Sequence, residues 1–338
     1  MSTEVREAPR DPEAPQDSVG GTLRSGRGRL ADPVFKWVVA ACGTIVLVIL
    51  ALMVVRTTTE AWPVFAKEGF FGFLFGDTWD PGTSRTEITG TYSAWPFIYG
   101  TLVTAAIAIA IALPLAIMVS VYLTHMAPRR IAKPLSYTVE LLAAVPSVIF
   151  GLWGLHWFLP NVLRPFFDAL EGALGWFFLF EGPVRGVGYL PAGIVLAIMI
   201  LPIMTAIIRE VIAVQPLDQQ MAGYALGSTR WEVITKVVLP SSFSGIVAAA
   251  MLGLGRALGE TIAVLMLIGG SQSWGASLFG TGSSMASHIA ATFGESSPES
   301  RIALMAIGVA LFLVTMIVNI LARVIVWRLG QTTGDSAV

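Results

Sequence analysis

Two residues of opposite charge, Arg256 and Glu260, interrupt an apolar stretch over residues 243–270. Full charges at membrane depth are costly, so they face a protein interior or a water-filled path and usually serve function. On one continuous helix, a spacing of four places both residues on the same face. Small residues share that face: Gly245, Ala249 and Gly253. We therefore predict an interior anion path here; the alternative is a structural pair in which each charge neutralises the other.

A second acid, Glu140, lies shortly before Pro146 and Ser147 in another apolar stretch. Proline removes a backbone hydrogen bond and loosens a helix. Freed carbonyl groups beside Ser147 need polar partners, which is tolerable only next to a cavity or another protein surface. Two interpretations stay open for Glu140: it lines the same path, or water or a basic neighbour holds it at the interface.

The loop over residues 215–240 carries a pattern of small residues followed by Leu-Pro. It resembles the coupling motif of ABC importer permeases, and five residues occupy positions of that motif: Ala222, Gly223, Gly227, Leu239 and Pro240. Met221 departs from that motif, in which an acid is usual. We expect a short helix that enters a groove on an ATPase and ends at Gly227, because glycine tolerates left-handed dihedral angles. The alternative is an ordinary amphipathic loop.

The elements that must position these residues are membrane helices. Of 338 residues, 55% are hydrophobic and 13% charged, which excludes an ordinary soluble protein. Apolar runs long enough to cross a bilayer predict an all-α integral membrane protein with six spans. They cover residues 34–55, 96–123, 137–158, 189–214, 243–270 and 302–327. We interpret the aromatic stretch 158–180 as an interfacial helix, because charged residues interrupt it.

Basic residues predict the orientation, since they are retained on the cytoplasmic side. With both termini inside, 14 of the 21 basic residues are cytoplasmic and six are outside. Residues 1–33, polar and rich in proline, are expected to form a disordered cytoplasmic tail without a signal peptide. Residues 34–328 then form the permease domain and 329–338 a second cytoplasmic tail.

Other chemistry has little support in the residues. Cys42 stands alone, and His125, His156 and His288 lie in separate segments without the spacing of a zinc site. The sequence has no phosphate-cradling Walker loop, so ATP and Mg²⁺ would bind a separate chain. We expect no catalytic residues, no metal and no cofactor in this chain, and no concentrated basic patch indicates nucleic acid.

Together these residues resemble the PstC permease family over about residues 34–328. The resemblance also covers segments 71–81, 96–102, 140–154 and 256–261. It implies a type I ABC importer permease fold in the bacterial plasma membrane and inorganic phosphate as substrate. It also implies a PstA-type permease partner, a PstB-type ATPase dimer and a PstS-type binding protein. The intramembrane charges of the family correspond to Arg256 and Glu260, and we expect Thr261, Glu140 and Ser147 to line the same path.

Three other classes remain as alternatives. An ABC permease for another anion or small solute would keep the coupling loop and change the pathway residues. A passive channel or secondary transporter would need no ATPase. A membrane enzyme is disfavoured, because the sequence shows no nucleophile, metal set or acid-base cluster.

Overall fold

A computed structural model describes residues 31–81, 89–184 and 186–334, and regular structure in these ranges is helical. The predicted N-terminal tail lies outside the described residues up to residue 30. The helices, with η marking π-helical turns, are α1 (Ala31–Glu68), α2 (Phe70–Phe75), α3 (Trp95–Val121), η1 (Tyr122–Met126), α4 (Arg129–Ala143), α5 (Ser147–Trp153), η2 (Gly154–Leu163), α6 (Arg164–Leu174), α7 (Tyr189–Ala213), α8 (Leu217–Ala225), α9 (Arg230–Val233), η3 (Ile234–Val238), α10 (Leu239–Ser241), α11 (Phe243–Leu258), α12 (Ile262–Ile268), α13 (Met285–Thr292) and α14 (Pro298–Gly334).

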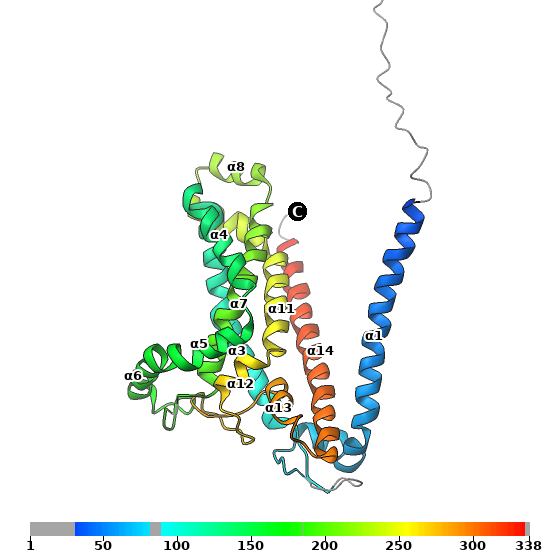
Figure 1. The fold of residues 1–338 in the computed structure, drawn as a ribbon. Coiled ribbons are helices and arrows are strands. Elements are labelled where there is room, and N and C mark those ends of the chain that lie inside the picture. Colours follow the sequence, from blue (N-terminus) through cyan, green and yellow to red (C-terminus); the bar gives the residue numbers. More distant parts are fainter. Residues whose placement is uncertain (1–30, 82–88, 185, 335–338) are drawn as a thin grey trace, which may run out of the picture. The chain divides into compact units, whose positions relative to one another are not determined.

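The chain divides into two compact units at Val54 and Val55. In the first unit, the described part of α1 is apolar and its side chains from residue 33 onward are exposed. A helix that is apolar all round suits a membrane span. In the second unit, Figure 1 shows α8 at one end, near the end of α14, and α6, α12 and α13 toward the other.

Among the described residues, four helices are long and apolar enough to cross a membrane, or up to six when each of two bent helix pairs is counted as one span. Counted in this way, the number agrees with the six predicted spans, with two corrections to their shape. The third is not straight: it bends by 95° between α4 and α5, at the break that Pro146 predicted. The fifth is not one helix, because α11 ends at Leu258 and α12 begins at Ile262.

The main core lies between α3 and α7, which pack along their lengths. One side of α3 presents small residues at helical spacing: Ala105, Ala108, Ala112 and Ala116. All four are buried. On the facing helix, Gly193 leaves room for Ile107. Small side chains let membrane helices approach closely, so this packing fixes α7 as the centre of the unit.

A second core gathers the last turns of α1, the start of α3, α13 and the start of α14. The carboxylate of Glu299, 2% exposed, holds the segment before α3 against this core. It accepts hydrogen bonds from the backbone N–H groups of Thr89 and Gly90, both at 2.6 Å, and from the Thr89 hydroxyl at 3.0 Å. These bonds tie the loop to the first turn of α14.

Candidate functional site

Arg256 lies in the last turn of α11, and its side chain is exposed in the isolated chain. The small residues predicted on this side of the helix do pack against a neighbour. Methyl groups on Gly245 and Gly253 would meet Val211 and Met204 of α7, and Ala249 is buried. An arginine exposed on a spanning helix cannot face lipid at low cost. Its guanidinium group is therefore available to a partner subunit or to a ligand in a polar path.

Glu260 does not share a helical face with Arg256, contrary to the prediction. The helix breaks between them, because α11 ends at Leu258 and Glu260 precedes α12. Its half-buried carboxylate instead accepts a long contact, 3.5 Å, from the N–H of Ala263 in the first turn of α12. Among the ion pairs of the described residues, none joins Arg256 to Glu260. This arrangement weighs against a simple structural pair.

The break between α11 and α12 leaves Thr261 just before the start of α12, and the start of another helix, α5, lies at the same end. Helix α12 packs closely on α5, where Gly151 lies against Ala263, and on the start of η2, where Gly154 lies against Leu267. Because both contacts advance in the same order along the chain, the two helices run parallel. Their first residues therefore lie at the same end. Ser147 begins α5, and Thr261 precedes α12.

Glu140 forms an ion pair with Arg209 of α7, with 2.6 Å between its Oε1 and the arginine Nη2. The Glu140 side chain is 46% exposed and that of Arg209 is 21% exposed. Glu140 thus has a basic neighbour in its own chain, which one of its two interpretations expects. Arg209 was not predicted as the partner of Glu140. Its position in the last turns of an otherwise apolar span was the available signal for a polar partner.

The coupling loop contains the predicted short helix. Helix α8 covers Leu217–Ala225, none of its residues is buried, and Gly227 after it has a left-handed φ of 82°. Gly223 packs against Val233, so a methyl group there would stand 3.1 Å from the valine side chain. The chain then turns at a capping box between Thr229 and Glu232. Helix α8 lies at one end of the second unit (Figure 1), and each of its residues is at least partly exposed.

Leu239 and Pro240 lie in α10, just before a 67° bend into α11. The residues predicted to couple to an ATPase are therefore joined through one short connection to the span that carries Arg256. Sequence reasoning missed the large apolar side chains that α8 and its flanks leave exposed: Val214, Leu217, Met221, Tyr224 and Leu226.

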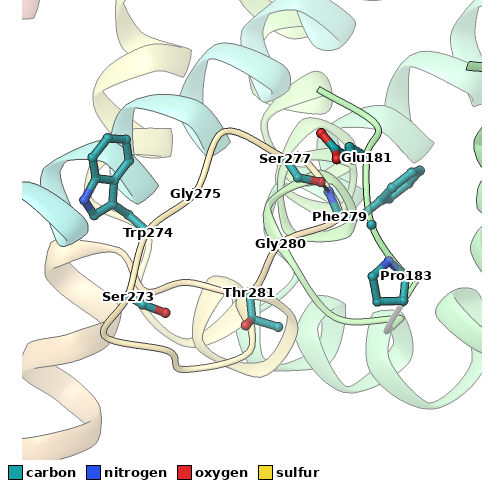
Figure 2. A pocket seen from close by; sticks show the side chains of 10 residues that line it. Glu181, Pro183, Ser273, Trp274, Gly275, Ser277, Phe279, Gly280 and Thr281 are labelled. Carbon is teal, nitrogen blue, oxygen red and sulfur yellow. Dashed lines mark hydrogen bonds between the residues drawn. The ribbon is translucent and has the colours of Figure 1, made fainter. Parts of the chain in front are cut away.

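At the end of the unit opposite α8, a pocket of about 230 Å³ lies between segments 181–183 and 273–281. Figure 2 shows Trp274 on one side of it and Glu181 and Pro183 on the other. The loop that carries Trp274 also covers the start of α7. Gly280 and Leu278 carbonyl groups accept from the N–H groups of Tyr189 and Leu190 at 3.1 and 2.9 Å. The sequence analysis did not predict this pocket.

Within the described ranges, no group of three or more His, Cys, Asp or Glu residues could hold a metal ion. The three histidines lie in η1, η2 and α13.

Comparison with known proteins gives a consistent result. Residues 112–331 match the family model described as the binding-protein-dependent transport system inner membrane component. The phosphate transport system permease protein PstC of Haemophilus influenzae is 38% identical over 307 residues, which cover 90% of this chain and 95% of the relative. PstC 2 of Mycobacterium tuberculosis is 41% identical over 305 residues, covering 88% and 92%.

A solved bacterial alginate ABC transporter, in complex with an alginate pentasaccharide-bound periplasmic protein, has a similar fold. Its TM-score is 0.58 at 15% identity, with 90% of this chain and 98% of the other covered. This likeness concerns the fold alone, and it agrees with the predicted all-α fold of a type I ABC importer permease. The chain belongs to the binding-protein-dependent transport system inner membrane components and, among them, to the PstC permeases.

Proposed function

We propose that this chain is the membrane permease subunit of an ATP-driven importer of inorganic phosphate. The exposed Arg256 on a membrane-spanning helix carries the proposal, together with relatives that are named phosphate transport system permeases. Arginine stays protonated and offers planar N–H donors that match phosphate oxygens. Arg256 forms no ion pair with a carboxylate of the described residues, so it retains that capacity.

Glu260 adds selectivity in this proposal. Phosphate near neutral pH still carries P–OH groups, from which a carboxylate can accept a hydrogen bond. A fully deprotonated anion such as sulfate offers no donor, so the carboxylate repels it. Thr261 and Ser147, at the parallel starts of α12 and α5, supply hydroxyl groups that can donate to or accept from the passing ion.

The energy comes from a separate ATPase, which binds ATP and Mg²⁺. A PstB-type ATPase dimer receives α8, whose apolar residues have no cover within the described chain. Movement of α8 reaches Arg256 through the bend at the start of α11. A PstA-type permease completes the path beside Arg256, and a PstS-type protein delivers phosphate from the side opposite α8.

Both termini face the cytoplasm in this proposal. The basic residues at the α8 end support it, because positive residues favour the cytoplasmic side. The end of α14 and helix α8 lie at the same end of the second unit (Figure 1), which is consistent with a cytoplasmic C-terminus.

Uptake in proteoliposomes that contain the four types of subunit tests the function. We expect phosphate uptake that requires ATP, and we expect sulfate uptake to be at least tenfold slower, about 1.4 kcal/mol of discrimination. Arg256→Gln should abolish uptake while the complex still assembles, because it removes the charge that offsets phosphate desolvation. Uptake without ATP would instead assign a channel or secondary transporter. Preferred uptake of another solute would assign a different ABC permease.

A further inference from the structure

A groove of about 430 Å³, lined by both polar and apolar residues, lies between α4, η1 and the last turns of α7. Three charged side chains line it, Lys133, Glu140 and Arg209. Three hydroxyl groups line it as well: those of Thr124, Ser136 and Tyr137. The groove is distinct from the Arg256 region, because none of its lining residues belongs to α11 or α12.

The groove is built by one face of α4. Lys133, Ser136, Tyr137 and Glu140 follow each other at intervals of three, one and three residues, which places them side by side on a helix. Arg209 faces them from α7 and uses Nη2 to donate to Glu140. A guanidinium group has five N–H donors, so this one bond leaves further donors for a second acceptor.

Among the described residues, several donors of this face have no partner. The ion pairs of the described residues do not include Lys133, and their hydrogen bonds do not include the hydroxyl groups of Ser136 and Tyr137. The ionised lining sums to one net positive charge. Two cations and two uncommitted hydroxyl groups around a space of this size favour a small anion.

Glu140 narrows the choice of anion. A carboxylate inside an anion site repels a ligand that offers only acceptors, and it accepts a hydrogen bond from a ligand that carries P–OH. We propose that this groove is a binding site for inorganic phosphate, held by Lys133 and Arg209 and recognised through P–OH by Glu140. A lipid phosphodiester lacks that donor and fits less well. The side on which the site lies, the cytoplasm, rests on the proposed function; the binding itself does not.

The test uses the full-length chain in nanodiscs of phosphatidylcholine. Every sample carries Arg256→Gln, which removes the other residue proposed to bind phosphate. Inorganic phosphate is titrated by calorimetry. We expect Lys133→Gln to weaken binding by about tenfold, the value of one charge-assisted hydrogen bond. Arg130→Gln is the matched control: it removes the same charge from the same helix but does not line the groove. It should leave the affinity unchanged.

Two further experiments distinguish inorganic phosphate from sulfate and from a lipid phosphodiester as the ligand. Glu140→Gln should let sulfate bind, because the repulsive carboxylate is gone. Nanodiscs that contain phosphatidylglycerol should bind inorganic phosphate as before. The proposal is overturned if Lys133→Gln has no effect, or if Arg130→Gln weakens binding equally. It is also overturned if phosphatidylglycerol occupies the groove in a Lys133-dependent manner and inorganic phosphate does not displace it. The binding test is made in chains that lack Arg256, whereas the proposed transport function depends on Arg256. Transport by the wild-type complex can therefore fail or succeed independently of the binding results.

Discussion

Gly151 of α5 lies against the backbone of Ala263 in α12, so closely that a methyl group at position 151 would stand 3.0 Å from the Ala263 Cα. The same methyl group would stand 2.9 Å from the Met266 sulfur. A backbone atom cannot move aside as a flexible side chain can. The contact therefore joins two broken spans into one unit and holds Ser147 and Thr261 at the same end.

Gly151→Ala should destabilise the protein, although alanine favours helices. Overpacking costs about 1–3 kcal/mol, which exceeds the helix gain of about 1 kcal/mol. Thermal unfolding of the purified complex measures the effect. Gly172→Ala in α6 is the control, because nothing lies within 4 Å of a methyl group there. It should be neutral or stabilising, and equal behaviour of the two variants would contradict the tight packing of α5 on α12.

Ala222→Asp should uncouple ATP hydrolysis from uptake. The exposed Ala222 lies on α8, and a charge there opposes docking of an apolar helix into a groove. Both activities are measured in proteoliposomes with the partner subunits. Ala173→Asp makes the same change at an exposed position of α6 and should leave coupling intact. Full coupling in the Ala222 variant would remove α8 from the ATPase interface.

The double variant Arg256→Met with Glu260→Met should assemble yet remain inactive in phosphate uptake. A purely structural pair predicts recovery, because both charges disappear together. The exposed pair of Arg56 and Glu60, with 2.8 Å between Nε and Oε1, serves as the comparison. Neutralising both of its members should leave uptake unchanged, since surface pairs contribute only about 0–1 kcal/mol. Restored uptake in the Met variant would refute the pathway role.

His288 makes the stability of the protein depend on pH. It is 3% exposed and stacks on Phe97, with 4.0 Å between ring centroids, and burial lowers its pKa to about 4. The folded state thus binds the proton less readily than the unfolded state. This residue's contribution is complete above about pH 6.5 and is lost progressively as the pH falls toward 4.

Melting temperatures between pH 7 and 4 test this dependence. His288→Phe keeps an aromatic ring against Phe97 and should flatten the profile. His156→Phe, at an exposed position of η2, should not. A profile that is equally steep in all three proteins would assign the pH dependence to other groups.

Cysteine labelling decides the orientation. In a chain without Cys42, Ser273→Cys should react with an impermeant thiol reagent added outside cells. Gln219→Cys on α8 should react only after the membrane is opened. Both positions are exposed in the described chain, so access depends on the side of the membrane. The opposite pattern would invert the topology and place α8 away from any cytoplasmic ATPase.

The sequence predicted features that depend on local chemistry. Apolar length predicted the six crossings, Pro146 predicted the break before α5, and Gly227 predicted the left-handed residue after α8. Each of these follows from a single residue type or from a run of them, and needs no knowledge of distant neighbours.

Other features depend on contacts between distant segments and were missed. The Glu140–Arg209 pair joins residues 69 positions apart, and the sequence around either residue does not indicate the other as its partner. The break at Glu260 was wrongly interpreted as continuous helix, because Gly259 and Thr261 are compatible with either structure. The break instead of a continuous helix goes with two contacts that the local sequence does not contain: the packing of α5 against α12, and the contact of Glu260 with the first turn of α12.

Exposed apolar side chains on and beside α8 should also affect how fast the subunit is degraded in the cell. Leu226 is 88% exposed and Met221 is 62% exposed. Surfaces of this kind are recognised by proteases and chaperones when a subunit has no partner. We expect an unassembled chain to be degraded faster than one in a complex, so its abundance should follow the supply of its ATPase.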